Sequence, residues 1–341
     1  MLFIVMAITI LSLGFLSRSD VELACGENMI LRTQMDYLAE SGLERARGLI
    51  LNPQEIPLEE LDPNHEYWMG RTDLQLDPNT NDFYDVSVVK LEGECNYKIT
   101  CDAYREKEEN GEKIKIGQSS LKAELRLDPC ITLWTADSST ISDNTTINGD
   151  VYCGGNFTNS GIINGDVFAS GFLGIDPASG QKYGIDKAVG VVNPGLNIIN
   201  FITPTYIPDS NGNVVISENL TVDGPFAVDC NLVINGSTIK ITAPKNSPAL
   251  LVGNKLTLEN GAVLEVNGFA QTANGLSVDN GTEVKITGAL FIIGTGGISG
   301  AGKVTITTDP AKASLQIPPE KGGPISWSPA AGAFFKSIER K

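Results

Sequence analysis

The chain has 341 residues, with 41 acidic against 25 basic side chains, one histidine and a formal net charge of −16 at pH 7. This acidic balance argues against nucleic acid as a partner and against electrostatic attachment to a membrane surface, and it suits a periplasmic or extracellular module. The length allows two domains of ordinary size, and six cysteines without a C-x-x-C pair argue against zinc-ribbon and thioredoxin-like redox sites.

The first segment, residues 1–16, is apolar and carries no charged side chain. Sixteen helical residues span roughly 24 Å, short of the roughly 30 Å hydrocarbon core of a bilayer. Because no Lys or Arg precedes the run, we expect a membrane helix whose apolar part begins before Met1. A cleavable secretory signal is the alternative, but the helical pattern continues and no small-residue cleavage site stands before Arg18.

The helical pattern runs on without a proline until Pro53, which predicts one helix over residues 1–52. Apolar residues recur every three or four positions and form one stripe, whereas charged residues occupy another face. The stripe contains Leu31, Met35, Leu38, Gly42, Ala46 and Leu49. The charged face contains Arg32, Asp36, Glu40, Glu44 and Arg47.

A small antiparallel sheet is expected in residues 53–128. Residues 53–82 form a polar connection rich in Pro and Asp. Period-two alternation then predicts strands over residues 84–91, 95–104 and 114–127, the last two joined by a charged hairpin that contains Asn110-Gly111. Three such strands are enough to cover the apolar stripe of the helix, so this part of the chain is expected to be an α+β module.

Residues 36–46, DYLAESGLERA, resemble the end of the N-terminal helix in minor pilins of the PilX type and in the minor pseudopilins of type II secretion. The resemblance covers residues 1–52 and extends loosely to residue 128. The motif positions are Ala39, Glu40, Gly42, Leu43 and Glu44. No basic stretch ending in glycine precedes the apolar run, so the prepilin-peptidase site of that family is not located in this sequence.

This resemblance implies a pilin-like module and a filament subunit. The helix would reside in the bacterial inner membrane before assembly and in the filament core afterwards, with the C-terminal domains periplasmic or at the cell surface. The implied partners are other pilin or pseudopilin subunits, the membrane, and a surface or polysaccharide ligand. The residues expected to pack helices together are Leu31, Met35, Leu38, Gly42, Leu43 and Ala46.

Residues 129–341 are rich in Gly and Asn and lack helical periodicity. Residues 147–151 (INGDV) recur at 163–167, residues 219–224 (NLTVDG) resemble 231–236 (NLVING), and the pattern of 256–268 recurs at 276–288. Periods of 12 to 20 residues are typical of a solenoid, so we expect an all-β parallel β-helix with inward Val, Ile and Leu. An irregular β-sandwich is the alternative, and INGDV also resembles bactofilin-type β-helices.

Two segments of this half depart from the repeat. Residues 174–213 contain four prolines and are expected to protrude as an insertion. Residues 325–341 are apolar in their middle and are expected to cap the last coil, because an open solenoid end exposes unpaired strand edges.

We expect no catalytic residue, no cofactor and no metal. His65 lies alone in the polar connection, and no P-loop, dinucleotide-binding or H-E-x-x-H motif occurs. Four aspartates stand in turn sequences that account for them: Asp150, Asp166, Asp223 and Asp279. If sixteen residues make one coil, Asp150 and Asp166 stack one above the other, and we expect them at a solvated corner of the solenoid. Residues 77–82 and 209–213 resemble fragments of calcium loops and are expected to be turns.

The six cysteines are Cys25, Cys95, Cys101, Cys130, Cys153 and Cys230. Cys95 and Cys101 lie on one expected strand, roughly 20 Å apart when it is extended, so they cannot pair unless that strand bends. Cys95 or Cys101 is therefore expected to pair with Cys130, in a chain exported to an oxidising compartment.

The sequence favours a non-enzymatic minor pilin or pseudopilin-like subunit that displays a β-helical domain for filament assembly, adhesion or secretion. Two other functions stay open. A membrane-tethered β-helical carbohydrate-active enzyme would need charged residues on one solenoid face beside residues 174–213. A bactofilin-like scaffold that polymerises end to end would need uncapped solenoid ends.

Overall fold

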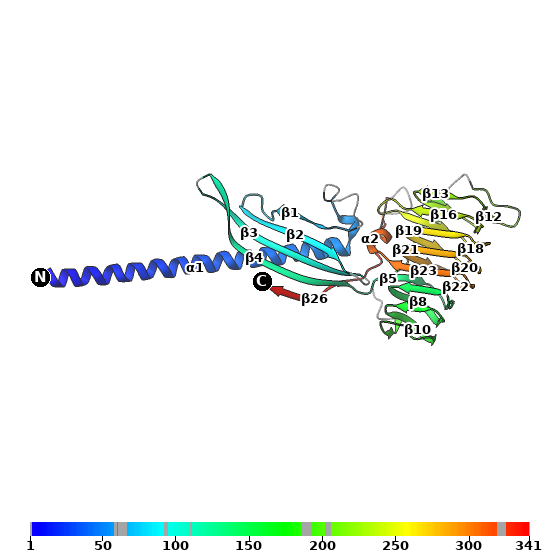
Figure 1. Ribbon diagram of the computed structural model, residues 1–341, viewed down its shortest axis with the longest axis horizontal. Coiled ribbons are helices and arrows are strands. Elements are labelled where there is room, and N and C mark those ends of the chain that lie inside the picture. Colours follow the sequence, from blue (N-terminus) through cyan, green and yellow to red (C-terminus); the bar gives the residue numbers. More distant parts are fainter. Residues whose placement is uncertain are drawn as a thin grey trace.

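The computed structural model describes residues 2–57, 60, 67–91, 95–109, 111–185, 192–201, 206–318 and 325–340, and structural statements refer to these residues. They form a helix module, in which a long N-terminal helix lies on an antiparallel sheet, and a parallel β-solenoid (Figure 1). The helix projects beyond its sheet on the side away from the solenoid (Figure 1). This architecture confirms the fold class expected from the periodicities.

Helix α1 (Leu2–Leu51) is one uninterrupted element of 50 residues. At 1.5 Å per residue it is about 75 Å long. It ends just before Pro53, which disfavours the α conformation in the preceding residue, and a short 3₁₀ helix, η1 (Pro53–Glu55), follows. Between residues 35 and 50 the helix buries one face, whereas the side chains described from residue 4 to residue 30 are all exposed.

The antiparallel sheet has the order β1-β2-β3-β4-β26. Its strands are β1 (Gly70–Leu74), β2 (Asp82–Lys90), β3 (Asn96–Glu109), β4 (Glu112–Leu127) and β26 (Ala333–Arg340). The three central strands are those that alternation predicts, and Val86, Ile99 and Leu125 point from them toward α1. Strand β1 lies in the expected polar connection. It buries only Leu74, so it shows no apolar alternation that a sequence pattern could detect.

Strand β26 shows that the expected cap at residues 325–341 is wrong for residues 333–340. It pairs antiparallel with β4, with Ala333 opposite Leu127 and Arg340 opposite Leu121, and so forms an edge of the helix module (Figure 1). The physical reason is that β4 would otherwise be an unpaired edge. Ala333 and Phe335 also add to the apolar cluster beneath α1.

The solenoid is built from short parallel strands in two chain segments. The first segment contains β5 (Ile131–Thr135), β6 (Ser139–Ile141), β7 (Thr145–Asn148), β8 (Asp150–Asn159), β9 (Ile162–Asn164), β10 (Val167–Gly174) and β11 (Lys182–Tyr183). The second contains β12 (Asn213–Ile216), β13 (Leu220–Asp223), β14 (Phe226–Val228), β15 (Asn231–Asn235), β16 (Thr238–Thr242), β17 (Pro248–Val252), β18 (Leu256–Glu259), β19 (Val263–Thr272), β20 (Leu276–Val278), β21 (Glu283–Ile292), β22 (Ile298–Ser299) and β23 (Lys303–Thr308). Inward Val, Ile and Leu side chains of both segments form one continuous core.

These two segments meet in the middle of the stack. Strand β21 pairs with β5, β22 with β6, and β23 with β7, so the last coil of the second segment lies on the first coil of the first. The chain therefore joins the stack at its middle, winds to one end at β11, crosses to the opposite end at β12 and winds back to the middle (Figure 1). The order of coils in the stack can differ from their order in the sequence, because any coil with parallel strands can pair with the exposed strand edges of another coil.

The register confirms two of the three sequence repeats as coils. Val151 lies beside Val167, and Leu256 lies beside Leu276. The similarity between residues 219–224 and 231–236 is not a coil repeat, because Leu220 pairs with Ile239, whereas Asn231 pairs with Asn213. Adjacent sides of one coil have similar sequences, because each side is a short strand of alternating inward apolar and outward polar residues that is followed by a turn.

The expected insertion at 174–213 is largely the crossover between the two ends. Strand β11 still pairs with β10, so residues 182–183 belong to the solenoid. The described part 192–201, with the 3₁₀ helix η4 (Ile198–Phe201), does not protrude: Leu196 and Phe201 are buried in the apolar cluster on the outer surface of the stack. Helix α2 (Pro310–Ala313) and strands β24 (Leu315–Ile317) and β25 (Ile325–Trp327) carry further members of that cluster.

Candidate functional site

The apolar stripe of α1 packs on the sheet of its own chain. Members of the stripe and of the motif are buried against β2, β3 and β4, while Leu31 is half-buried and the two motif glutamates are exposed. The buried residues are Met35, Leu38, Ala39, Gly42, Leu43 and Ala46; the exposed ones are Glu40 and Glu44. The buried residues are therefore covered before any second subunit is present.

Gly42 marks the closest approach of α1 to the sheet. A Cβ at this position would collide with the Cys101 sulfur and would lie 2.9 Å from a ring carbon of Tyr84. Burial also raises the pKa of the Cys101 thiol to about 12, with the nearby Asp102 and Asp85 as weaker causes. Cys101 is thus a neutral packing residue beneath the helix.

The charged face of α1 is tied to the sheet at its edge. Asp36 accepts a hydrogen bond from the Ser119 hydroxyl on β4 (2.6 Å) and pairs with Arg340 on β26 (3.0 Å). Arg340 also lies 3.8 Å from Glu40. The C-terminal strand therefore contacts α1 through both its apolar and its charged residues.

The projecting half of α1, residues 2–30, has no sheet beneath it (Figure 1). Its large apolar side chains between residues 4 and 16 are 58% to 71% exposed; those described are Ile4, Met6, Ile8, Ile10, Leu11, Leu13, Phe15 and Leu16. Within the described part of the chain, no helix is long and apolar enough to cross a membrane.

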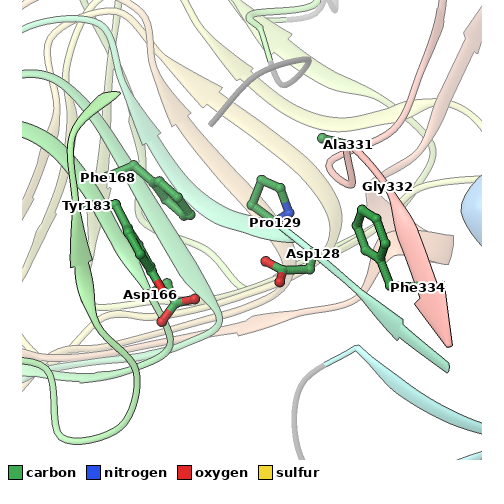
Figure 2. A pocket seen from close by; sticks show the side chains of 8 residues that line it. All are labelled: Asp128, Pro129, Asp166, Phe168, Tyr183, Ala331, Gly332 and Phe334. Atoms are coloured by element: carbon green, nitrogen blue, oxygen red, sulfur yellow. The ribbon is translucent and has the colours of Figure 1, made fainter. Parts of the chain in front are cut away.

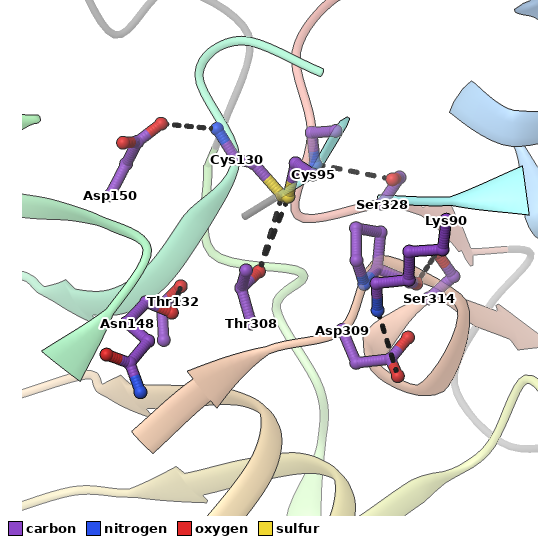
Figure 3. The surroundings of a disulfide bond; sticks show 12 residues. Lys90, Cys95, Cys130, Thr132, Asn148, Asp150, Thr308, Asp309, Ser314 and Ser328 are labelled. Carbon is purple, nitrogen blue, oxygen red and sulfur yellow. Dashed lines mark hydrogen bonds and ion pairs between the residues drawn. A yellow bond between two sulfur atoms is a disulfide. The ribbon is translucent and has the colours of Figure 1, made fainter. Parts of the chain in front are cut away.

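The two modules are joined covalently at a buried junction (Figure 3). Cys95, before β3, forms a disulfide with Cys130, before β5, and Thr308 Oγ1 lies 3.3 Å from the Cys130 sulfur. This realises one of the two pairings that strand geometry left open. Lys90 on β2 also pairs with the buried Asp309 that follows β23 (3.6 Å). The solenoid is therefore held to the helix module at the middle of its stack.

Asp150 and Asp166 stack in successive coils, as the 16-residue period implies, but the expectation of a solvated corner is wrong. Both side chains are buried. Asp150 accepts the backbone N–H of Cys130 (2.8 Å) and of Asp166 (2.9 Å), and Asp166 accepts that of Gln181 (2.7 Å). Each carboxylate thus satisfies N–H groups of neighbouring coils that turn geometry leaves without a strand partner.

A junction pocket of about 400 Å³ opens between the two modules (Figure 2). It is lined by residues from four separate segments: Asp128, Pro129, Asp166, Phe168, Tyr183, Ala331, Gly332 and Phe334. Phe168 and Tyr183 stack on one side with ring centroids 5.4 Å apart, and Phe334 stands on the other. Sequence reasoning missed this site. The one signal for it was the recurrence of aromatic residues at near-coil spacing, at Trp134, Tyr152, Phe168 and Tyr183.

The metal-ligating side chains of the described residues do not cluster: no group of three occurs among them, and His65 lies outside the described part of the chain. Asp77 accepts the N–H of Asn79 and Asp209 that of Asn211, so both calcium-loop fragments are turns. The solenoid surface beneath residues 192–201 is apolar and aromatic, whereas the enzyme alternative requires charged residues there.

Comparisons with known proteins leave the family open. No family model matches the sequence, and no curated protein matches it. Among solved structures, the chain is similar to the competence-associated pilin ComZ from Thermus thermophilus, with 10% sequence identity and a TM-score of 0.25 over 91% of this chain and 97% of that one.

Proposed function

We propose that the chain is a non-enzymatic minor pilin or pseudopilin-like structural subunit that carries a β-solenoid into or onto a filament. The observation that carries this proposal is the division of α1. One half buries a face on the chain's own sheet, while the projecting half begins with an uncharged apolar stretch, whose described side chains at residues 4–16 are exposed. The pilin-type motif lies in the buried half, where it positions the helix on its sheet.

The energetics of the projecting half favour association. Burying one Leu, Ile or Phe side chain contributes about 1.5–3 kcal/mol relative to leaving it in water. Residues 4–16 hold many such side chains and no charge, so lipid or neighbouring apolar helices are the environments that suit them. We therefore propose that this half resides in the bacterial inner membrane before assembly and among the helices of other subunits afterwards.

The arrangement of the modules supports display. The solenoid and the N-terminus lie at opposite ends of the molecule, with the sheet between them (Figure 1). A helix held in a filament core would place the solenoid outward, in the periplasm or at the cell surface. The disulfide and the pairing of β26 with β4 would hold the solenoid in a fixed position relative to the helix module.

The test is a truncation placed by the structure. Removal of residues 1–28 leaves Met35 and the other sheet-packing residues in place, so the truncated chain should fold with an unchanged melting temperature. We expect the full chain in the membrane and sheared-filament fractions of cells that express a pilus or pseudopilus system, and the truncated chain in the soluble fraction. Identical fractionation of two folded chains would refute the proposal.

Cross-linking gives a second measurement on the intact chain. Cys25 is exposed on the projecting half, whereas the other free cysteines described are buried or half-buried. If this half packs among other helices, a cysteine-directed photo-cross-linker attached at Cys25 should yield adducts with filament subunits in whole cells. The matched control is Cys25→Ser, which should yield none. Adducts with lipid alone would support anchoring and count against filament packing.

A further inference from the structure

We propose that the junction pocket binds a sugar ring of a neutral polysaccharide. The lining combines aromatic side chains on two sides with the Asp128 carboxylate between them and the Asp166 carboxylate beside Tyr183 (Figure 2). Its volume, about 400 Å³, lies within the range typical of small-molecule sites, which is roughly 300–1,000 Å³. The junction pocket would then be the site of the polysaccharide ligand that the sequence analysis expects.

The aromatic walls come from different modules. Tyr183 is 37% exposed and is backed by Phe168, so one face of its ring is supported by stacking. Phe334 is 60% exposed on the edge strand β26 and packs over Gly332, where a Cβ would stand 2.8 Å from its ring. Exposed rings of this kind leave apolar area in water. A pyranose can cover that area with its C–H face while its hydroxyls point outward.

The charges of the pocket favour a neutral hydrogen-bond donor. The Asp128 carboxylate is half-buried and makes no hydrogen bond or ion pair with the described residues, so it is available to accept from hydroxyl groups. Asp166 already accepts from Gln181 and lies 3.7 Å from Arg126. Arg126 therefore balances the charge of Asp166, and Asp128 is left as the uncompensated charge among the lining residues. Asp128 opposes an anionic ligand and can accept hydrogen bonds from the hydroxyl groups of a neutral sugar.

The pocket depends on the return of the chain. Asp128 and Pro129 connect the modules, Asp166, Phe168 and Tyr183 belong to the solenoid, and Phe334 arrives from the C-terminal strand. The biological role of this site rests on the proposed function, in which a filament displays the solenoid. Sugar binding to the pocket does not depend on that display. A chain that binds sugar without entering filaments would refute the display proposal alone, and a filament subunit that binds no sugar would refute this inference alone.

The experiment is saturation-transfer NMR on the full chain in a detergent without a sugar headgroup. The probes are cellotriose, maltotriose and chitotriose, with tetramethylammonium as the cationic probe. We expect transfer to the ring C–H protons of at least one trisaccharide. Phe334→Ala and Asp128→Asn should each weaken its affinity about five- to tenfold, the loss expected of one aromatic contact or one charge-assisted hydrogen bond.

Matched controls separate the pocket from the surface in general. Tyr37→Ala removes an exposed ring from α1 and Asp143→Asn an exposed carboxylate from the solenoid, and neither should change the affinity. Phe334 is largely exposed, so its replacement should leave the melting temperature nearly unchanged. Transfer to none of the trisaccharides, transfer only to tetramethylammonium, or full affinity in the folded Phe334→Ala/Asp128→Asn double variant would each overturn the inference.

Discussion

At the scale of single residues, Asp150 shows how the solenoid tolerates a buried carboxylate. Loss of water raises its pKa to about 6, because desolvation outweighs the stabilisation of the charged form by the N–H groups of Cys130 and Asp166. The neighbouring Asp166 raises the pKa further and Arg126 lowers it. The carboxylate organises two coils, at a cost that depends on pH.

The sign of that dependence follows from the two pKa values. The folded value, about 6, lies above the ordinary 3.8, so the contribution of this group to stability is greatest below pH 4 and is lost as the pH rises through 6. The loss is on the order of 3 kcal/mol. We expect the free energy of unfolding of the native chain, minus that of Asp150→Asn, to fall between pH 4 and 7 and then level off. Urea titrations under non-reducing conditions measure it, and equal differences at pH 4.5 and 7.5 would contradict the assignment.

Gly42 is the residue where the helix and the sheet come closest, and it gives a second prediction. Gly42→Ala gains about 1 kcal/mol of helix propensity but must displace Cys101 or Tyr84, and overpacking a core costs about 1–3 kcal/mol. We expect a net destabilisation of about 1–2 kcal/mol in denaturant unfolding. Cys101→Ala in the same chain should recover part of the loss.

The matched control lies further along the same helix. Gly48 is in α1, and a Cβ added there would meet nothing within 4 Å, so Gly48→Ala should stabilise the chain by up to about 1 kcal/mol. If both alanine variants stabilised the protein equally, close packing at Gly42 would not be the reason that a glycine stands there.

At the scale of elements, the C-terminal strand is the part that local pattern misassigned most clearly. Strand β26 has an apolar start and a charged end, which is as compatible with a solenoid cap as with a sheet edge. Its partner, β4, lies more than 200 residues earlier in the chain. Period-two alternation reveals that a segment is extended, but it does not reveal which exposed edge the segment will cover.

Deletion of residues 333–341 tests the role of β26. It removes Ala333 and Phe335 from the cluster beneath α1 and leaves β4 as an edge, so we expect the helix module to lose several kcal/mol of stability. Hydrogen exchange should accelerate in β4 and α1 and stay unchanged in the inner strands of the solenoid. Arg340→Ala, which removes two ion pairs of a largely exposed guanidinium, should change stability by only about 1 kcal/mol. Unchanged protection of β4 in the deletion variant would argue against this role.

At the scale of the whole molecule, the disulfide between Cys95 and Cys130 links the modules where the chain joins the solenoid. It closes a loop with a sequence separation of 35, for which chain entropy predicts a contribution of about 3–4 kcal/mol. The double variant Cys95→Ser/Cys130→Ser should melt at a lower temperature than the native chain. Added reductant should lower the melting temperature of the native chain and leave that of the variant unchanged. A double variant that melts at the same temperature as the native chain would show that the cross-link contributes nothing.

Much of the architecture follows from local sequence. The uninterrupted periodicity to Pro53 predicted α1, alternation predicted β2, β3 and β4, and the 16- and 20-residue repeats predicted coils of a parallel solenoid. Strand β1 was not predicted, because four of its five residues are not buried. The 12-residue repeat was wrongly interpreted as a coil, because two sides of one coil share a sequence pattern. The stripe residues could be named in advance, but not the sheet face that would cover each of them.

The sequence by itself determined the type of each module, because helical and extended periodicities are properties of neighbouring residues and need no distant partner. Only the tertiary structure decided that the solenoid is stacked from two segments, that β26 returns to the first sheet, that Cys95 rather than Cys101 pairs with Cys130, and that Phe334 faces Tyr183 across a pocket. Each of these depends on which unpaired edge or apolar face a distant segment buries. That choice is made by the free energy of the assembled chain and leaves little trace in any local pattern.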